Sequence, residues 1–113
     1  MQIINQTRNT ILANDAVVAD TMATRFIGLL HHDSLPVGQG MVITQCRSIH
    51  MFFMKFAIDV IFVDRNKIVV GLVRGIKPFQ MSAYYGRADC AIELPAGQID
   101  KTQTALKDQI SWV

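Results

Sequence analysis

Short apolar runs rich in β-branched and aromatic residues dominate the chain after residue 40, and runs of this length and composition predict strands. They are MVIT at 41–44, SIHMFF at 48–53, IDVIFVD at 58–64, KIVVGLV at 67–73 and DCAIEL at 89–94. Only Arg65-Asn66 separates the third run from the fourth between flanking Asp64 and Lys67, which predicts a hairpin. The tail TALKDQISWV adds a possible last strand, with Ile110 and Trp112 on one face.

The central runs are apolar on both faces, since Val60 and Phe62 point one way and Ile61 and Val63 the other. Both faces of such strands must therefore be covered by other parts of the protein. A helix is predicted to begin at Asp20 or Thr21 and to continue as TMATRFIGLLHH, with Met22, Phe26, Leu29 and Leu30 on one apolar stripe. The predicted fold is therefore mostly β (α+β), a compact antiparallel barrel-like sheet with one short helix packed against it.

Composition narrows the classes of protein. With 113 residues, half of them apolar and 18% charged, the chain fits a single domain over 1–113. The basic residues are scattered and the formal charge is only +2, which disfavours a nucleic-acid partner. No run of about twenty apolar residues occurs, so no membrane span is predicted. The amino end does not read as a secretory signal, so a cytoplasmic location is expected.

The densest group of candidate functional residues is CRSIHMFFMKFAIDVIFVD at 46–64. Lys55 and Asp59 are isolated charges within this apolar stretch, and an ionised group in such a setting needs a partner. They are candidates for a ligand site with His50 as a titratable neighbour. The structural alternative is that Asp59 accepts hydrogen bonds from backbone amides at a strand entry, or pairs with Lys55 or an arginine.

Two further features suggest chemistry. Cys46 and His50 are residue types that bind zinc or form a nucleophile, but the repeated short spacings of a metal site are missing, so no metal or cofactor is predicted. With only two cysteines, Cys46 and Cys90 are expected to be buried or partly buried thiols rather than a disulfide framework. Glu93 precedes the turn residues Pro95 and Gly97 and either lines a pocket or bonds neighbouring amides or an arginine.

An aromatic segment, KPFQMSAYYGR, carries Phe79, Tyr84 and Tyr85. It is either the rim of a binding site or a lid over the core.

Several motifs together resemble one known family. The series RFIGLL, DSLPVGQGMV, CRSIHMFFMKFAIDVIFVDRNKIVVGLV, IKPF and AIELPAGQI is similar to the bacterial and archaeal domain of unknown function 192, from about residue 16 to the end. The resemblance implies a compact β-rich, barrel-like fold with a short helix and brings no activity, substrate or cofactor. The family's recurrent positions correspond here to Arg25, Gly28, Gly40, Met41, Met54, Lys55, Asp59, Glu93, Pro95 and Gly97.

The chain also departs from that family. Leu30, His32 and Phe53 stand where relatives usually have methionine, arginine and often tryptophan, and Pro78-Phe79-Gln80 replaces a Pro-Trp-Arg sequence. The two missing arginines argue against an anionic ligand at those positions. Many relatives carry an export signal, which this sequence does not show.

The leading hypothesis is a non-catalytic module that binds a small ligand or a protein partner in a cleft. Its predicted site residues are Arg25, His50, Lys55, Asp59 and Glu93, with the aromatic segment close by. The alternative is a small hydrolase-like or metal-assisted enzyme that uses His50 with Cys46 or Asp59. A third hypothesis, a structural or assembly domain, predicts an exposed apolar patch instead of a pocket.

Overall fold

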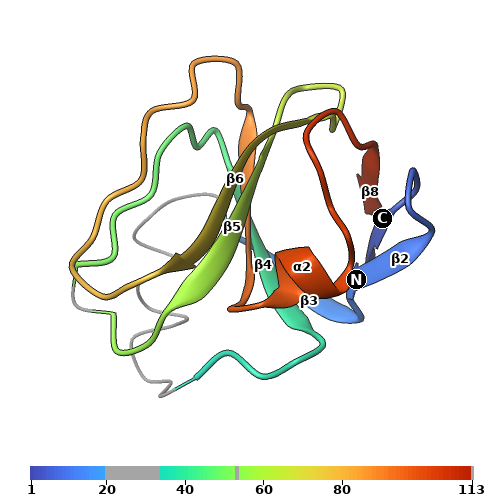
Figure 1. Ribbon diagram of the computed structural model, residues 1–113. Coiled ribbons are helices and arrows are strands. Elements are labelled where there is room, and N and C mark those ends of the chain that lie inside the picture. Colours follow the sequence, from blue (N-terminus) through green and yellow to red (C-terminus); the bar gives the residue numbers. More distant parts are fainter. Residues whose placement is uncertain (20–33, 53, 113) are drawn as a thin grey trace.

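The computed structural model describes residues 1–19, 34–52 and 54–112. The described elements are β1 (Ile3–Asn5), β2 (Thr10–Ala13), β3 (Asp15–Ala19), β4 (Gln39–Thr44), β5 (Ile58–Val63), β6 (Val69–Ile76), β7 (Cys90–Pro95), the short helix α2 (Gln98–Lys101) and β8 (Ile110–Trp112). The strands form a three-stranded sheet in the order β2-β1-β8 and a five-stranded sheet in the order β3-β4-β7-β5-β6 (Figure 1). The mostly β prediction is confirmed, although the described strands form two sheets and not a closed barrel.

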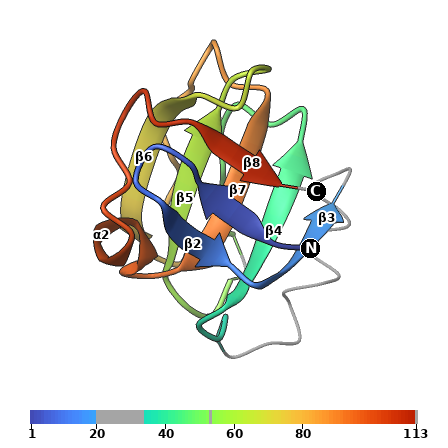
Figure 2. The ribbon, with the colours of Figure 1, turned by 90° about the vertical axis from the view of Figure 1, so that its right-hand side faces the viewer.

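The two sheets are layered. Figure 2 shows the small sheet lying across one face of the large sheet, with both chain ends beside it. Apolar side chains from both sheets fill the space between them, which we call the inter-sheet core; they include Ile3, Leu12, Val42, Ile61, Ile92, Leu94 and Ile110. The opposite face of the large sheet packs against loop residues in a second cluster, the loop-side core, which includes Met41, Ile49, Met51, Met54, Val60, Phe62 and Ala91.

Strand β5 shows why both faces of the large sheet must be covered. All six of its residues are buried. Val60 and Phe62 belong to the loop-side core, whereas Ile61 and Val63 belong to the inter-sheet core. The prediction that this strand buries both faces is confirmed, and the small sheet and the loops supply the two covers.

One edge of the large sheet differs from the prediction of an antiparallel sheet. β3 pairs with β4 in parallel, in a register that sets Val17 opposite Met41. Parallel neighbours need a long crossover connection. The helix predicted at 21–32 falls within this connection and lies outside the described residues.

The predicted hairpin at Arg65-Asn66 is confirmed. β5 and β6 are antiparallel neighbours. The Asp64 carboxylate accepts hydrogen bonds from the amides of Asn66 and Ile68 at 2.9 and 3.0 Å, which closes the turn.

The strands predicted at 41–44, 58–64, 67–73 and 89–94 correspond to β4, β5, β6 and β7, and the tail forms β8. Ile110 and Trp112 both pack on the inter-sheet core, as predicted. The strand predicted at 48–53 is wrong for the described residues 48–52, where pairing is limited to an isolated bridge between His50 and Met81. Its apolar residues bury themselves through loop packing instead.

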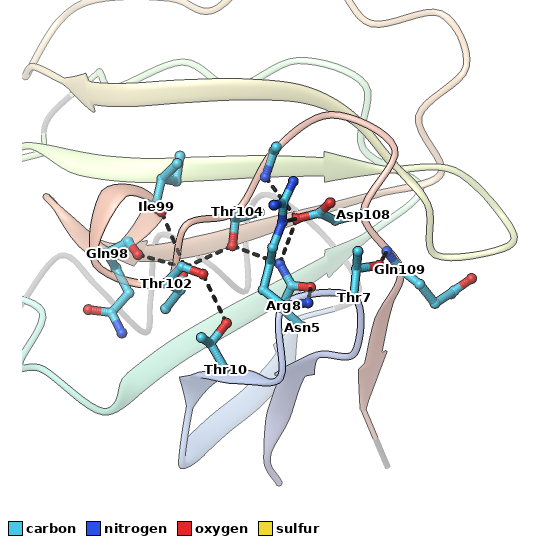
Figure 3. Close-up of polar contacts among 11 residues, drawn as sticks. Asn5, Thr7, Arg8, Thr10, Gln98, Ile99, Thr102, Thr104, Asp108 and Gln109 are labelled. Atoms are coloured by element: carbon cyan, nitrogen blue, oxygen red, sulfur yellow. Dashed lines mark hydrogen bonds and ion pairs between the residues drawn. The ribbon is translucent and has the colours of Figure 1, made fainter.

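The sequence did not indicate β1, β2 or α2, because polar residues interrupt these segments. Asn5 shows how a polar residue is accommodated: it is fully buried, and its amide nitrogen donates to Thr104 at 3.1 Å and to Asp108 at 3.0 Å. Asp108 also accepts from the Arg8 guanidinium at 3.0 Å and from the Ala105 amide at 2.9 Å (Figure 3). This cluster attaches the first strand to the last turn of the chain.

Candidate functional site

The two buried carboxylates proposed from sequence face opposite sides of the large sheet. Glu93 on β7 lies opposite Met41 of β4 and Val60 of β5, both of which are in the loop-side core. Asp59 on β5 lies opposite Leu94, which is in the inter-sheet core. Directly opposite residues share a face, so the sheet separates the two carboxylates and they do not form one cleft.

Asp59 has the structural role that the sequence left open as an alternative. It is 1% exposed, and one carboxylate oxygen accepts a hydrogen bond from the Gly75 amide at 2.8 Å. The other accepts from the amides of Gly97 and Ile99 at 3.1 and 2.9 Å. Because these bonds hold α2 and the end of β6 together, Asp59 positions the backbone.

The remaining predicted residues divide between the covering loop and the sheet. His50 is half-buried beside Phe52, with ring centroids 4.9 Å apart, and Lys55 is exposed. Glu93 is fully buried at the centre of the large sheet. His50 and Glu93 are therefore on the loop side and Asp59 is not, so the structure does not bring His50 to Asp59. Arg25 lies outside the described residues.

The two cysteine thiols have different surroundings. Neither Cys46 nor Cys90 forms a disulfide, and both are buried, as expected from sequence. The Cys46 thiol donates to the Ser48 carbonyl at 3.1 Å. Burial, with the carboxylate of Asp89 beside it, raises the pKa of Cys90 to about 11, so this thiol is protonated at neutral pH. Within the described ranges, no three His, Cys, Asp or Glu side chains gather as a metal site would require.

Two loop segments, 45–52 and 77–89, cover the loop-side core and lie next to each other; we call them the paired loops. Figure 1 shows both on the side of the large sheet away from the small sheet. Backbone hydrogen bonds of 2.8 Å join them at four places: Met51 N to Gln80 O, Phe79 N to Met51 O, Ser82 N to Ile49 O and Tyr85 N to Arg47 O. The segments support each other although neither contains a regular strand.

Tyr85 anchors the second loop to the sheet. Its ring stacks on Phe62 with centroids 4.5 Å apart. It also packs against Gly71 of β6, where a Cβ atom would come within 2.4 Å of the ring. Anchoring Tyr85 leaves its neighbour Tyr84 directed outward, with 67% of its surface exposed.

A pocket opens between the paired loops at the end of the large sheet where β4 ends and β7 begins. Its volume is about 640 Å³, and it is lined by Gln45, Cys46, Arg47, Ser48, Tyr84, Ala88 and Asp89. Arg47 is fixed in the wall, since its guanidinium donates to the Ala88 carbonyl at 3.2 Å and to the Tyr84 hydroxyl at 3.3 Å. We call this hollow the loop pocket; it has the size of a small-molecule site and is open to solvent.

Sequence reasoning identified Tyr84 as part of a possible rim but missed Arg47, Ser48 and Asp89. Arg47 and Ser48 belong to the first loop and Asp89 to the second, and they come together only when the paired loops align. In the sequence these polar residues differ from the apolar runs beside them, but that contrast alone does not indicate a pocket.

Taken together, the geometry defines a two-sheet β domain with a polar pocket formed by its covering loops. The chain belongs to the domain of unknown function 192 family (DUF192), described as "Uncharacterized ACR", whose model matches residues 3–112. The match extends further toward the amino end than the resemblance seen in the sequence.

Similar proteins support the same assignment. The chain is 35% identical to a UPF0127 protein of Thermococcus sibiricus, covering 97% of this chain and 73% of that one. It is 32% identical to a UPF0127 protein of Pyrococcus horikoshii, covering 97% of both chains. A solved protein of unknown function from Novosphingobium aromaticivorans has the same fold, with a TM-score of 0.83 and 18% identity over 99% of this chain and 84% of that one.

The described part of the chain contains no helix that is long and apolar enough to cross a membrane.

Proposed function

We propose that this protein is a non-catalytic binding module and that the loop pocket holds a small molecule. The observation that carries the proposal is the pocket of about 640 Å³, with a guanidinium fixed in its wall by Ala88 and Tyr84. A polar group held in place by the protein's own hydrogen bonds is preorganised for a ligand, because binding need not order it. The hydroxyl of Ser48 and the carboxylate of Asp89 add further polar contacts.

The catalytic alternative has less support from the same geometry. Asp59 uses both carboxylate oxygens on backbone amides and faces away from His50. Cys46, the other partner considered for His50, is buried, and its thiol donates a hydrogen bond to the Ser48 carbonyl at 3.1 Å. An enzyme of the kind considered from sequence requires an acid, base or nucleophile within hydrogen-bond reach of the reacting atoms.

Native mass spectrometry of the protein purified gently from its own cell extract tests the proposal. A bound small molecule adds mass that is released on denaturation. Ser48→Trp is the blocking variant, because Ser48 is exposed and an indole at this position can fill the pocket. The hydrogen bond from the Cys46 thiol goes to the main-chain carbonyl of Ser48, so the substitution need not disturb the core. The expected result is that the added mass disappears in this variant.

Lys101→Trp is the matched control. Lys101 is also exposed, but it lies on α2, beside the start of β5, whereas the pocket adjoins the end of β5. It should keep the added mass. A wild-type protein that carries no releasable molecule and is stabilised by none in a metabolite screen would contradict the proposal, as would added mass that Ser48→Trp leaves unchanged.

A further inference from the structure

We infer that the ligand of the loop pocket carries a phosphate group next to a planar ring, an inference that rests on the function proposed above. Two features of the pocket support this inference. One is the distribution of arginines around the pocket, and the other is the placement of the Tyr84 ring.

Three of the described arginines gather at one end of the molecule. A second hollow of about 300 Å³ is lined by Arg47, Arg65, Arg87, Ala88 and Asp89. It shares Arg47, Ala88 and Asp89 with the loop pocket, so the two hollows adjoin. Three arginines, from the first loop, the β5–β6 turn and the second loop, thus line one cavity in which Asp89 is the single acidic lining residue.

The other described arginines are engaged elsewhere. Arg8 pairs with Asp108 at 3.0 Å, and Arg74 pairs with Asp100 at 2.9 Å. Arg65 and Arg87, by contrast, are exposed and have no ion pair with any described carboxylate. Like charges placed close together without neutralising partners favour an anionic ligand, and the planar fork of arginine matches the oxygens of phosphate.

Tyr84 supplies a surface for a ring. Its hydroxyl accepts a hydrogen bond from Arg47 at 3.3 Å, which limits the positions of the aromatic plane. The residue lines the loop pocket and also a neighbouring hollow of about 250 Å³ with Val70, Tyr85, Gly86 and Arg87. A planar group stacked on Tyr84 would therefore have Arg47 or Arg87, each of which shares a hollow with Tyr84, as a neighbour for an attached phosphate.

Asp89 and Ser48 add a carboxylate and a hydroxyl to the lining of the loop pocket. A ligand made only of phosphate would be repelled by the Asp89 carboxylate, whereas a ligand with hydroxyl groups could donate hydrogen bonds to it. This combination of ring, hydroxyl donors and phosphate is the chemistry of a nucleotide-like small molecule. A long polyanion is less suited, because the arginine cluster is confined to one end of the large sheet.

Isothermal titration calorimetry at low ionic strength tests the ligand class with three probes: ADP, adenosine and inorganic pyrophosphate. ADP should bind at least about tenfold more tightly than adenosine, since only ADP can reach the arginines. It should also bind more tightly than pyrophosphate, which lacks the ring. Raising the salt concentration should weaken ADP binding and leave adenosine little changed.

Variants with a matched charge change make the test specific. Arg65→Gln and Arg87→Gln should each weaken ADP binding about tenfold, because each removes a charged hydrogen-bond donor. Tyr84→Leu should weaken ADP and adenosine alike. Arg74→Gln removes the same charge at the opposite end of the sheet and should change the affinity less than about twofold.

Equal binding of ADP and adenosine would overturn the inference, as would an equal loss of affinity in Arg74→Gln and Arg87→Gln. A short single-stranded oligonucleotide that binds more tightly than ADP would replace it with a nucleic-acid surface. If ADP fails while Ser48→Trp still removes a co-purified molecule, the binding module stands and only the ligand class is wrong. If ADP fails and Ser48→Trp removes nothing, both proposals fail.

Discussion

At the scale of single residues, Asp59 shows how a residue that resembles a site can be part of the scaffold. Its isolation among apolar neighbours is the same sequence signal that a buried catalytic acid would give. The difference lies in its partners, which are three backbone amides from the end of β6 and the start of α2. A carboxylate that satisfies several amides is costly to replace, because the amides, of which that of Ile99 is buried, then lose their acceptor.

Asp59→Asn should therefore lower the free energy of unfolding by about 1–3 kcal/mol, because one of the two oxygens becomes an NH2 group that faces backbone donors. Urea denaturation followed by circular dichroism measures the change. Asp100→Asn is the control: Asp100 pairs with Arg74 on the surface, where ion pairs contribute at most about 1 kcal/mol. Equal losses of unfolding free energy in the two variants would show that the hydrogen bonds of Asp59 do not make a major contribution to stability.

At the scale of elements, the paired loops act as a layer although they lack regular secondary structure. Hydrogen bonds between the segments and the stacking of Tyr85 on Phe62 replace a sheet ladder. The glycine at position 71 is required by this packing and not by its backbone conformation, since the Tyr85 ring occupies the place of a side chain.

Gly71→Ala should displace Tyr85, because the added methyl group would come within 2.4 Å of its ring. We expect a loss of about 1–3 kcal/mol in unfolding free energy, typical of overpacking, and faster amide hydrogen exchange at Tyr85, whose amide bonds to Arg47. Gly86→Ala is the control, since its Cβ would meet Tyr84 at an ordinary 3.8 Å. Unchanged exchange at Tyr85 in Gly71→Ala would contradict the anchoring role.

At the scale of the whole molecule, the small sheet joins the two ends of the chain. β1 lies between β2 and β8, and the polar cluster around Asp108 sits beside them (Figure 3). Burial by itself would raise the pKa of Asp108, but hydrogen bonds from Arg8, Asn5 and the Ala105 amide outweigh it and leave the pKa below its ordinary value. The negative charge of the buried Asp108 side chain therefore stabilises the contact between the two ends of the chain.

The lowered pKa of Asp108 makes the stability of the fold depend on pH. Because the pKa of Asp108 is lower in the folded chain than in the unfolded chain, the ionised group stabilises the fold above the ordinary aspartate pKa of 3.8. That contribution is lost as the pH falls through the folded value. The advantage of the wild type over Asp108→Asn in urea denaturation should be full at pH 7 and shrink below about pH 4. A difference that is constant from pH 7 to pH 3 would contradict it.

The sequence by itself determined the strands from β4 onward, the hairpin at Arg65-Asn66 and the burial of both faces of β5. These follow from local properties: composition, turn chemistry and the alternation of side chains along a strand. The same local rules failed for residues 48–52, whose apolar side chains pack in a loop, and for β1, whose buried Asn5 finds its partners about a hundred residues away.

Only the tertiary structure decided where the candidate side chains lie. Alternation says which residues of one strand share a face, but the face that two strands have in common depends on their register. In the observed register Asp59 lies opposite Leu94 and Val60 opposite Glu93, and a shift by one residue would have placed both carboxylates on the same side. The gathering of Arg47, Arg65 and Arg87 likewise depends on long-range packing of three segments, and no local pattern encodes it.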